Sequence, residues 1–195
     1  MNSFLSITPS RFESECRAIY RDLERLLEGL TREQFNWQPD GGRRWSIAQN
    51  LDHLIQGHRA YAVPIERAIA SARPRTDREP GVPNWFGAWF VGQLEPPVRI
   101  KMKAPSKIIP RLDLDPAEAR REFDASVDQI RVLLDRAWEV DLSRKRFANP
   151  FLRGLPAFNL ATGFLVPLAH MRRHIAQALA VKERSDFPAA PHQQG

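Results

Sequence analysis

The sequence predicts an all-α protein built as a four-helix bundle, with a long crossover between the second and third helices. Four amphipathic stretches carry apolar residues at helical spacing, and helix-capping patterns stand at the start of three of them. The second and third stretches are separated by residues 71–114. This segment is too rich in proline for one continuous helix and too long for a tight hairpin, so we expect it to cross over the bundle.

The first helix is expected over residues 10–30, with Ser10 and Glu13 at the spacing of a capping box. Its predicted buried stripe consists of Phe12, Cys16, Ile19, Leu23, Leu26, Leu27 and Leu30. Cys16 is the only cysteine of the chain. Because it shares this apolar stripe, we interpret it as a buried structural thiol rather than a nucleophile.

The second helix should begin at Ser46, which has capping-box spacing to Gln49, and should extend to about Ala70. Pro64 is expected to kink this helix or to lie near its end. The third helix is predicted at 116–137, with Asp115 as its N-cap. The fourth is predicted from near Pro156 to about Lys182.

A chain of 195 residues fits one domain, which we place at residues 1–184. Residues 185–195 are rich in Pro, Ala and Gln and are expected to form a mobile tail. The sequence has no signal-peptide pattern and no uninterrupted apolar run of about 18 residues. These features favour a cytoplasmic protein that does not span a membrane.

Three histidines predict a metal site. His170 and His174 are one turn apart on the fourth helix, so their side chains share a face and can converge on one ion. His53, about two turns into the second helix, can supply a third ligand. His58 is rotated by about 140° from His53 and cannot share its direction. The alternatives are a hydrogen-bonded core histidine at 53 and a chance His-x3-His pair.

The neighbours of these histidines are placed by the same helical geometry. Gln177 falls on the stripe of His170 and His174, where it could orient a ligand or bridge two helices. Arg172 and Arg173 are expected to point away from the pocket. Asp52 is about 100° from His53, so we favour a surface or supporting role over that of a general base.

Two segments resemble the signature segments of the DinB-like (DinB/YfiT) superfamily: Trp-Ser-Ile-Ala-Gln-Asn-Leu-Asp-His-Leu at 45–54 and His-Met-Arg-Arg-His-Ile-Ala-Gln at 170–177. Shorter matches lie at 36–39, 149–151 and 154–155. The resemblance covers most of the chain. It implies a four-helix bundle with a long crossover, a homodimer, and a divalent metal ion, nickel or zinc, held by His53, His170 and His174. Iron and manganese are further possibilities for three imidazole ligands.

Three neutral imidazoles leave open positions on a divalent ion, which is typical of a catalytic site. An activated water would make the protein a hydrolase, and a bound low-molecular-weight thiol would make it a thiol-dependent S-transferase, in either case acting on a small-molecule substrate. The sequence assigns no catalytic residue. The alternative is a metal-binding or small-molecule-binding protein without turnover.

Two features of the crossover leave further alternatives open. The aromatic segment at 85–90 could pack over the bundle, line the substrate site or form a dimer contact. A basic stretch contains Arg99, Lys101, Lys103, Lys107 and Arg111. Clustered basic residues can bind nucleic acid, but no nucleic-acid-binding motif accompanies them, so we favour a solvated loop.

Overall fold

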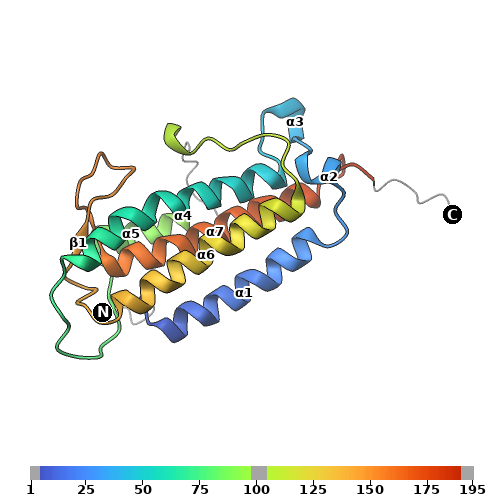
Figure 1. Cartoon of the computed structure of the whole chain (residues 1–195). Coiled ribbons are helices and arrows are strands. Elements are labelled where there is room, and N and C mark those ends of the chain that lie inside the picture. Colours follow the sequence, from blue (N-terminus) through green and yellow to red (C-terminus); the bar gives the residue numbers. More distant parts are fainter. Residues whose placement is uncertain (1–4, 98–104, 190–195) are drawn as a thin grey trace.

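Four long helices form a bundle in the computed structural model, which describes residues 5–97 and 105–189 (Figure 1). They are α1 (Pro9–Leu27), α4 (Ile47–Ala70), α6 (Pro116–Ala137) and α7 (Leu160–Lys182). Both α1 and α4 pack against α6 and α7. The predicted all-α bundle is confirmed.

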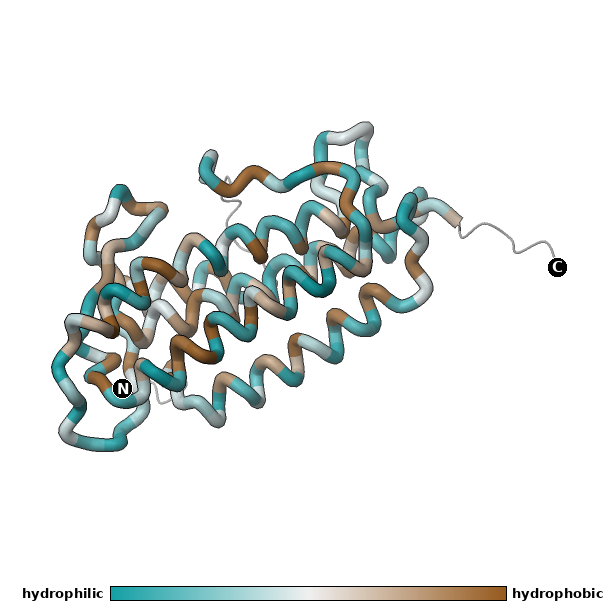
Figure 2. Tube along the Cα trace, in the orientation of Figure 1, coloured by the Kyte–Doolittle hydropathy of each residue, from teal (hydrophilic) through white to brown (hydrophobic). Residues whose placement is uncertain are grey.

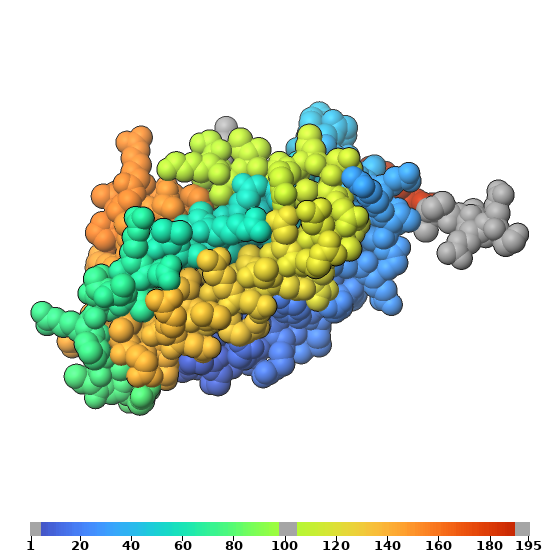
Figure 3. Space-filling model, viewed as in Figure 1, coloured from blue at the N-terminus to red at the C-terminus, as the bar shows by residue number. Residues whose placement is uncertain are grey.

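The crossover between α4 and α6 follows from the direction of the helices. In Figure 1, α4 and α6 run the same way, whereas α1 and α7 run the opposite way. The connection must therefore return along the length of the bundle. On its path it forms α5 (Trp85–Leu94), which packs on α7, and the 3-10 helix η1 (Ser106–Ile108), which contacts α4. In Figure 3 the segment that leads into α6 covers part of α4.

The predicted caps of α4 and α6 are confirmed. The Ser46 hydroxyl accepts a hydrogen bond from the Gln49 amide at 3.1 Å, and the Gln49 side chain accepts one from the Ser46 amide at 3.0 Å. The Asp115 carboxylate accepts from the Glu118 amide at the start of α6. Helix α4 continues through Pro64 and ends at Ala70.

Two predicted boundaries are wrong. Helix α1 begins at Pro9 with Thr8 as N-cap, because the Thr8 hydroxyl accepts from the Arg11 amide, and Ser10 lies inside the helix. It ends at Leu27, before Gly29 adopts a φ of 69°.

The start of α7 is the second correction. Instead of beginning near Pro156, α7 begins at Leu160, because the preceding strand β2 (Phe158–Asn159) pairs with β1 (Arg146–Phe147). Asn159 then caps the helix by accepting a hydrogen bond from the Thr162 amide.

Two short helices, α2 (Arg32–Asn36) and α3 (Pro39–Gly42), connect α1 to α4. The described part of the expected tail lies beside this connection: Phe187 packs edge-on against Trp37, and Gln34 donates to the Pro188 carbonyl. Residues 190–195 of that tail lie outside the described residues.

The core is formed by the apolar faces of the long helices. Hydrophilic and hydrophobic residues alternate along α1 and α6 in Figure 2, as expected for helices with one buried side. Cys16 is buried in α1, as predicted, and burial raises the pKa of its thiol to about 12. Within the described residues, no helix is long and apolar enough to cross a membrane.

The aromatic segment of the crossover forms α5 and divides between core and surface. Phe86 and Phe90 lie against Phe158 with ring centroids 5.6 and 5.1 Å apart, which confirms packing on the bundle. Trp85 remains 83% exposed. A role of this segment in a dimer contact stays a prediction.

The basic stretch is described only in part, since Arg99, Lys101 and Lys103 lie outside the described residues. Of the rest, Arg111 forms ion pairs with Asp52 and Glu122.

Candidate metal centre

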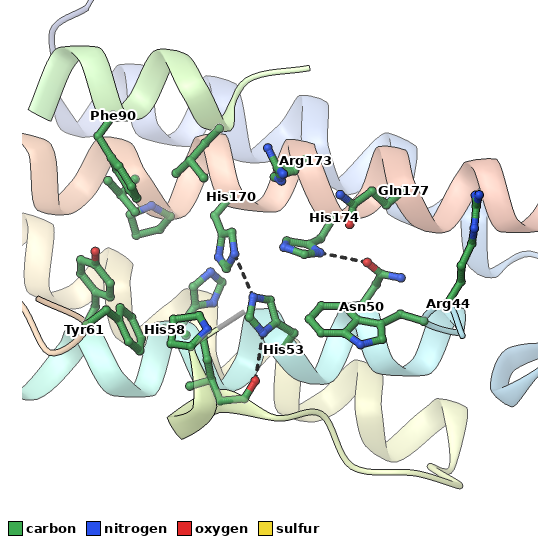
Figure 4. A pocket seen from close by; sticks show the side chains of 18 of the residues that line it. Arg44, Asn50, His53, His58, Tyr61, Phe90, His170, Arg173, His174 and Gln177 are labelled. Atoms are coloured by element: carbon green, nitrogen blue, oxygen red, sulfur yellow. Dashed lines mark hydrogen bonds between the residues drawn. The ribbon is translucent and has the colours of Figure 1, made fainter. Parts of the chain in front are cut away.

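The packing of α4 on α7 brings His53, His170 and His174 together between these two helices (Figure 4). One nitrogen from each ring can be chosen so that all three lie within 4.8 Å of one another. The Nε2 atoms of His53 and His170 are 3.1 Å apart. Ligands about 2.0–2.1 Å from one zinc ion can be separated by such a distance. The cluster could therefore hold a divalent metal ion.

Two hydrogen bonds set the tautomers of two of these histidines. His53 Nδ1 lies 3.1 Å from the backbone carbonyl oxygen of Ile108, which can only accept, so Nδ1 carries the proton. His174 Nδ1 likewise donates to the Asn50 side-chain oxygen at 2.9 Å. Asn50 is oriented by its own amide, which donates to the Ser46 carbonyl. Both imidazoles therefore keep the Nε2 lone pair for the centre of the cluster, the usual arrangement of a metal ligand.

Burial keeps these imidazoles neutral. It lowers the pKa of His53, and it holds the pKa values of His170 and His174 well below the ordinary value for histidine. Neighbouring histidines lower the pKa values of His170 and His174 further. Metal binding requires neutral imidazoles, so the surroundings favour the form that can act as ligand.

Trp45 covers one side of the cluster. Its ring centroid lies 4.9 Å from that of His53 and 5.8 Å from that of His174, where the two rings stack. It directly precedes the N-cap of α4, so the local fold that starts this helix also positions the indole. The indole limits the access of water to the histidines from this side.

His58 stands apart from the three clustered nitrogens, as the sequence predicts, but it lines the same cavity. Its Nδ1 donates to the Ser126 hydroxyl at 2.9 Å, because that hydroxyl already donates to the Phe123 carbonyl. The Nε2 atom is buried and has no hydrogen-bond partner among the described residues. Burial lowers the pKa of His58 to about 4, so this ring is also neutral.

Asp52 is fully buried, but it does not line the cavity. Its carboxylate accepts from the Arg111 amide at 2.7 Å, from Arg111 Nε at 2.9 Å and from the Gln56 side chain at 2.6 Å. This network attaches the crossover to α4. Ile108, whose carbonyl binds His53, is three residues before Arg111. The burial of Asp52 excludes the surface role, and its hydrogen bonds to the segment that follows Ile108 fit the supporting role that the sequence predicted.

The histidines open into a cavity of about 910 Å³. Gln177 lines it, as expected. Arg172 points away from the cavity and forms ion pairs with Glu15 and Glu95. The prediction for Arg173 is wrong: this residue is only 5% exposed and lines the cavity, and its Nη1 donates to the Gln93 carbonyl. The end of α5 covers this side of α7. The sequence of α7 alone does not predict that contact.

Sequence reasoning missed the groups that orient the histidines. Asn50 lies one turn before His53 on α4, and a buried amide at that spacing was an available signal. The Ile108 carbonyl carried no such signal, because its position depends on how the crossover folds back onto α4.

The fold and the site define a four-helix-bundle protein with a three-histidine cluster that could hold a divalent metal ion. The family model of the DinB superfamily matches residues 15–178, so the chain belongs to the DinB superfamily. This match confirms the resemblance seen in the two signature segments. Comparison with curated proteins and with solved structures found no match.

Proposed function

We propose that this chain is a metal-dependent enzyme in which His53, His170 and His174 bind one divalent ion. The observation that carries the proposal is a cluster of three neutral imidazoles, two of them fixed through Nδ1, at the wall of a cavity of about 910 Å³. Three protein ligands beside an open space are typical of catalytic rather than structural sites. Nickel and zinc are the proposed metals, and imidazole also suits iron.

When bound, such an ion lowers the pKa of a water or thiol and makes it nucleophilic near neutral pH. The residues of the chain supply the rest. Asn50 and the Ile108 carbonyl hold two imidazoles in position, and Trp45 limits water on one side. The cavity is of the size that binds a small molecule.

A thiol-dependent S-transferase is favoured over a hydrolase by the cavity wall. Among the described residues that line the cavity, none is Asp or Glu. Zinc hydrolases that activate water commonly use a carboxylate as general base, whereas a thiol already ionised at the site needs none. Hydrolysis is the second candidate, because His58 Nε2, in the same cavity wall, has no hydrogen-bond partner in the described part of the chain.

Turnover by metal-loaded protein tests this proposal. Protein reconstituted with nickel or zinc is assayed with low-molecular-weight thiols and an aryl halide, and then with esters and amides. We expect turnover that depends on the metal, disappears in His170→Ala and persists in Cys16→Ser, since the Cys16 thiol is buried within α1. Metal bound at about one ion per chain without turnover of any substrate would indicate a non-catalytic binding protein instead.

A further inference from the structure

The two ends of the cavity differ in chemistry (Figure 4). Phe90 and Tyr61 lie at one end, and Phe86 and Phe158 complete this aromatic end. Arg44 lies at the other end, beyond Gln177, and the histidines stand between the two ends.

Three arginines converge on the end opposite the aromatic residues. Arg44 Nε lies 2.6 Å from the Asp40 carboxylate, Arg184 Nη2 lies 2.9 Å from the same carboxylate, and Arg43 Nε donates to the Asp40 backbone carbonyl. All three arginines line the cavity, but Asp40 does not. Asp40 thus holds the cationic groups in position without facing the cavity itself. We call Arg43, Arg44 and Arg184 the cationic end.

The charges of the cationic end do not cancel. Among the described residues, two carboxylates match its three guanidinium groups: Asp40, and Asp186, which pairs with Arg184 at 2.7 Å. Because no acidic side chain is among the described lining residues, the excess positive charge of the cationic end attracts anions into the cavity.

We infer that the substrate is an amphiphilic organic anion, with its carboxylate or phosphate group at the cationic end and its apolar part against Phe86, Phe90 and Phe158. The planar guanidinium group matches both kinds of anion through paired N–H donors. The aromatic end removes apolar surface from water. This inference rests on the proposed function and deepens it, because it names the substrate class of the same cavity.

Calorimetric binding of three probes tests the inference without any turnover. The probes are phenylbutanoate, its uncharged amide phenylbutanamide, and phenylpropyl phosphate. Each is titrated into metal-free and zinc-loaded protein, because an anion that binds only the metal would bind only the loaded form. We expect at least one anion to bind both forms about 10-fold or more tighter than the amide. Which anion binds tighter identifies the head group.

Two variants and one control locate the anion. Arg44→Gln should weaken anion binding about 10-fold, the double variant Arg43→Gln/Arg44→Gln should weaken it further, and neither should change amide binding. Arg44 has an exposed side chain, so its replacement leaves the core intact. The control is Arg67→Gln, which removes one positive charge at a residue of α4 that does not line the cavity. This variant should leave binding unchanged.

The inference is overturned if the anions bind no tighter than the amide, if they bind only the zinc-loaded form, or if Arg67→Gln weakens binding as much as Arg44→Gln. The same experiments distinguish a failure of this inference from a failure of the proposed function. Loss of anion preference with intact metal-dependent turnover would refute the substrate class alone. Anion binding without turnover of any substrate would refute only the proposal that the protein is an enzyme.

Discussion

Helices α1 and α6 differ from α4 and α7 in what they bury. Every buried residue of α1 is apolar or cysteine, and Ser126 is the only polar residue that α6 buries. The other pair buries Asn50, Asp52, His53, His58, Thr162, Arg173 and His174, together with Gln49. A buried polar group costs free energy unless it is hydrogen-bonded. The first pair therefore contributes mainly apolar burial, whereas the second depends on hydrogen bonds to hold buried polar groups at the site.

The largest effect that separates the two regions is expected in the labelling rate of the Cys16 thiol in α1. Burial raises the pKa of its thiol to about 12, so at pH 8 the thiol is neutral and its reactive thiolate is rare. Since each pKa unit changes the thiolate fraction tenfold, we expect labelling by a disulfide reagent to be about a thousandfold slower in native protein than in urea. Labelling at similar rates in both states would show that α1 is not the inert region that we describe.

Next in size is the effect of Phe123→Ala on α6. Phe123 is fully buried, and removal of such a ring costs about 3–5 kcal/mol of unfolding free energy. Urea denaturation of metal-free protein measures this loss. Below the unfolding transition, the metal content per chain should equal that of the parent, because Phe123 does not line the cavity. Loss of the metal from a folded variant would show that α6 also contributes to metal binding, which contradicts the proposed difference between the two regions.

A smaller effect is expected from Asn50→Leu on α4. The variant removes the oxygen that accepts from His174 Nδ1, and loss of such a partner typically weakens metal binding about 10- to 100-fold. Competition with a chelator measures the affinity. Asn50→Asp is the matched control, since its carboxylate can still accept and should retain most of the affinity. Equal affinity of the parent and Asn50→Leu would mean that this hydrogen bond does not orient the ligand.

The smallest effect is predicted where the two regions meet at the surface. Arg136 of α6 pairs with Glu66 of α4 at 2.7 Å, but both side chains are about half exposed. Exposed pairs contribute roughly 0–1 kcal/mol, so Arg136→Ala should lower the unfolding free energy by no more than this. Denaturation at low and high salt checks the result. A loss above about 2 kcal/mol would show that the contact between α4 and α6 depends on this pair.

The difference between the two regions also explains what the sequence could predict. The starts of α4 and α6 and the buried stripe of α1 follow from local rules, because caps and periodicity involve residues within a few positions of one another. The approach of His53 to His170 and His174 was predicted from helix faces together with a family resemblance. By contrast, the environments of Arg173 and of His53 depend on the crossover: α5 covers Arg173, and Ile108 binds His53. No local pattern encodes contacts between segments so far apart.

Metal content measured by elemental analysis tests the central claim most directly. Untagged parent protein, His53→Ala and His58→Ala are reconstituted with nickel or zinc and freed of excess metal. His58 is the matched control, because it is a buried histidine on the same helix that lies outside the clustered nitrogens. Our account predicts about one ion per chain in the parent and in His58→Ala, and almost none in His53→Ala. A parent that retains no metal, or a His53→Ala variant that retains as much as the parent, would contradict it.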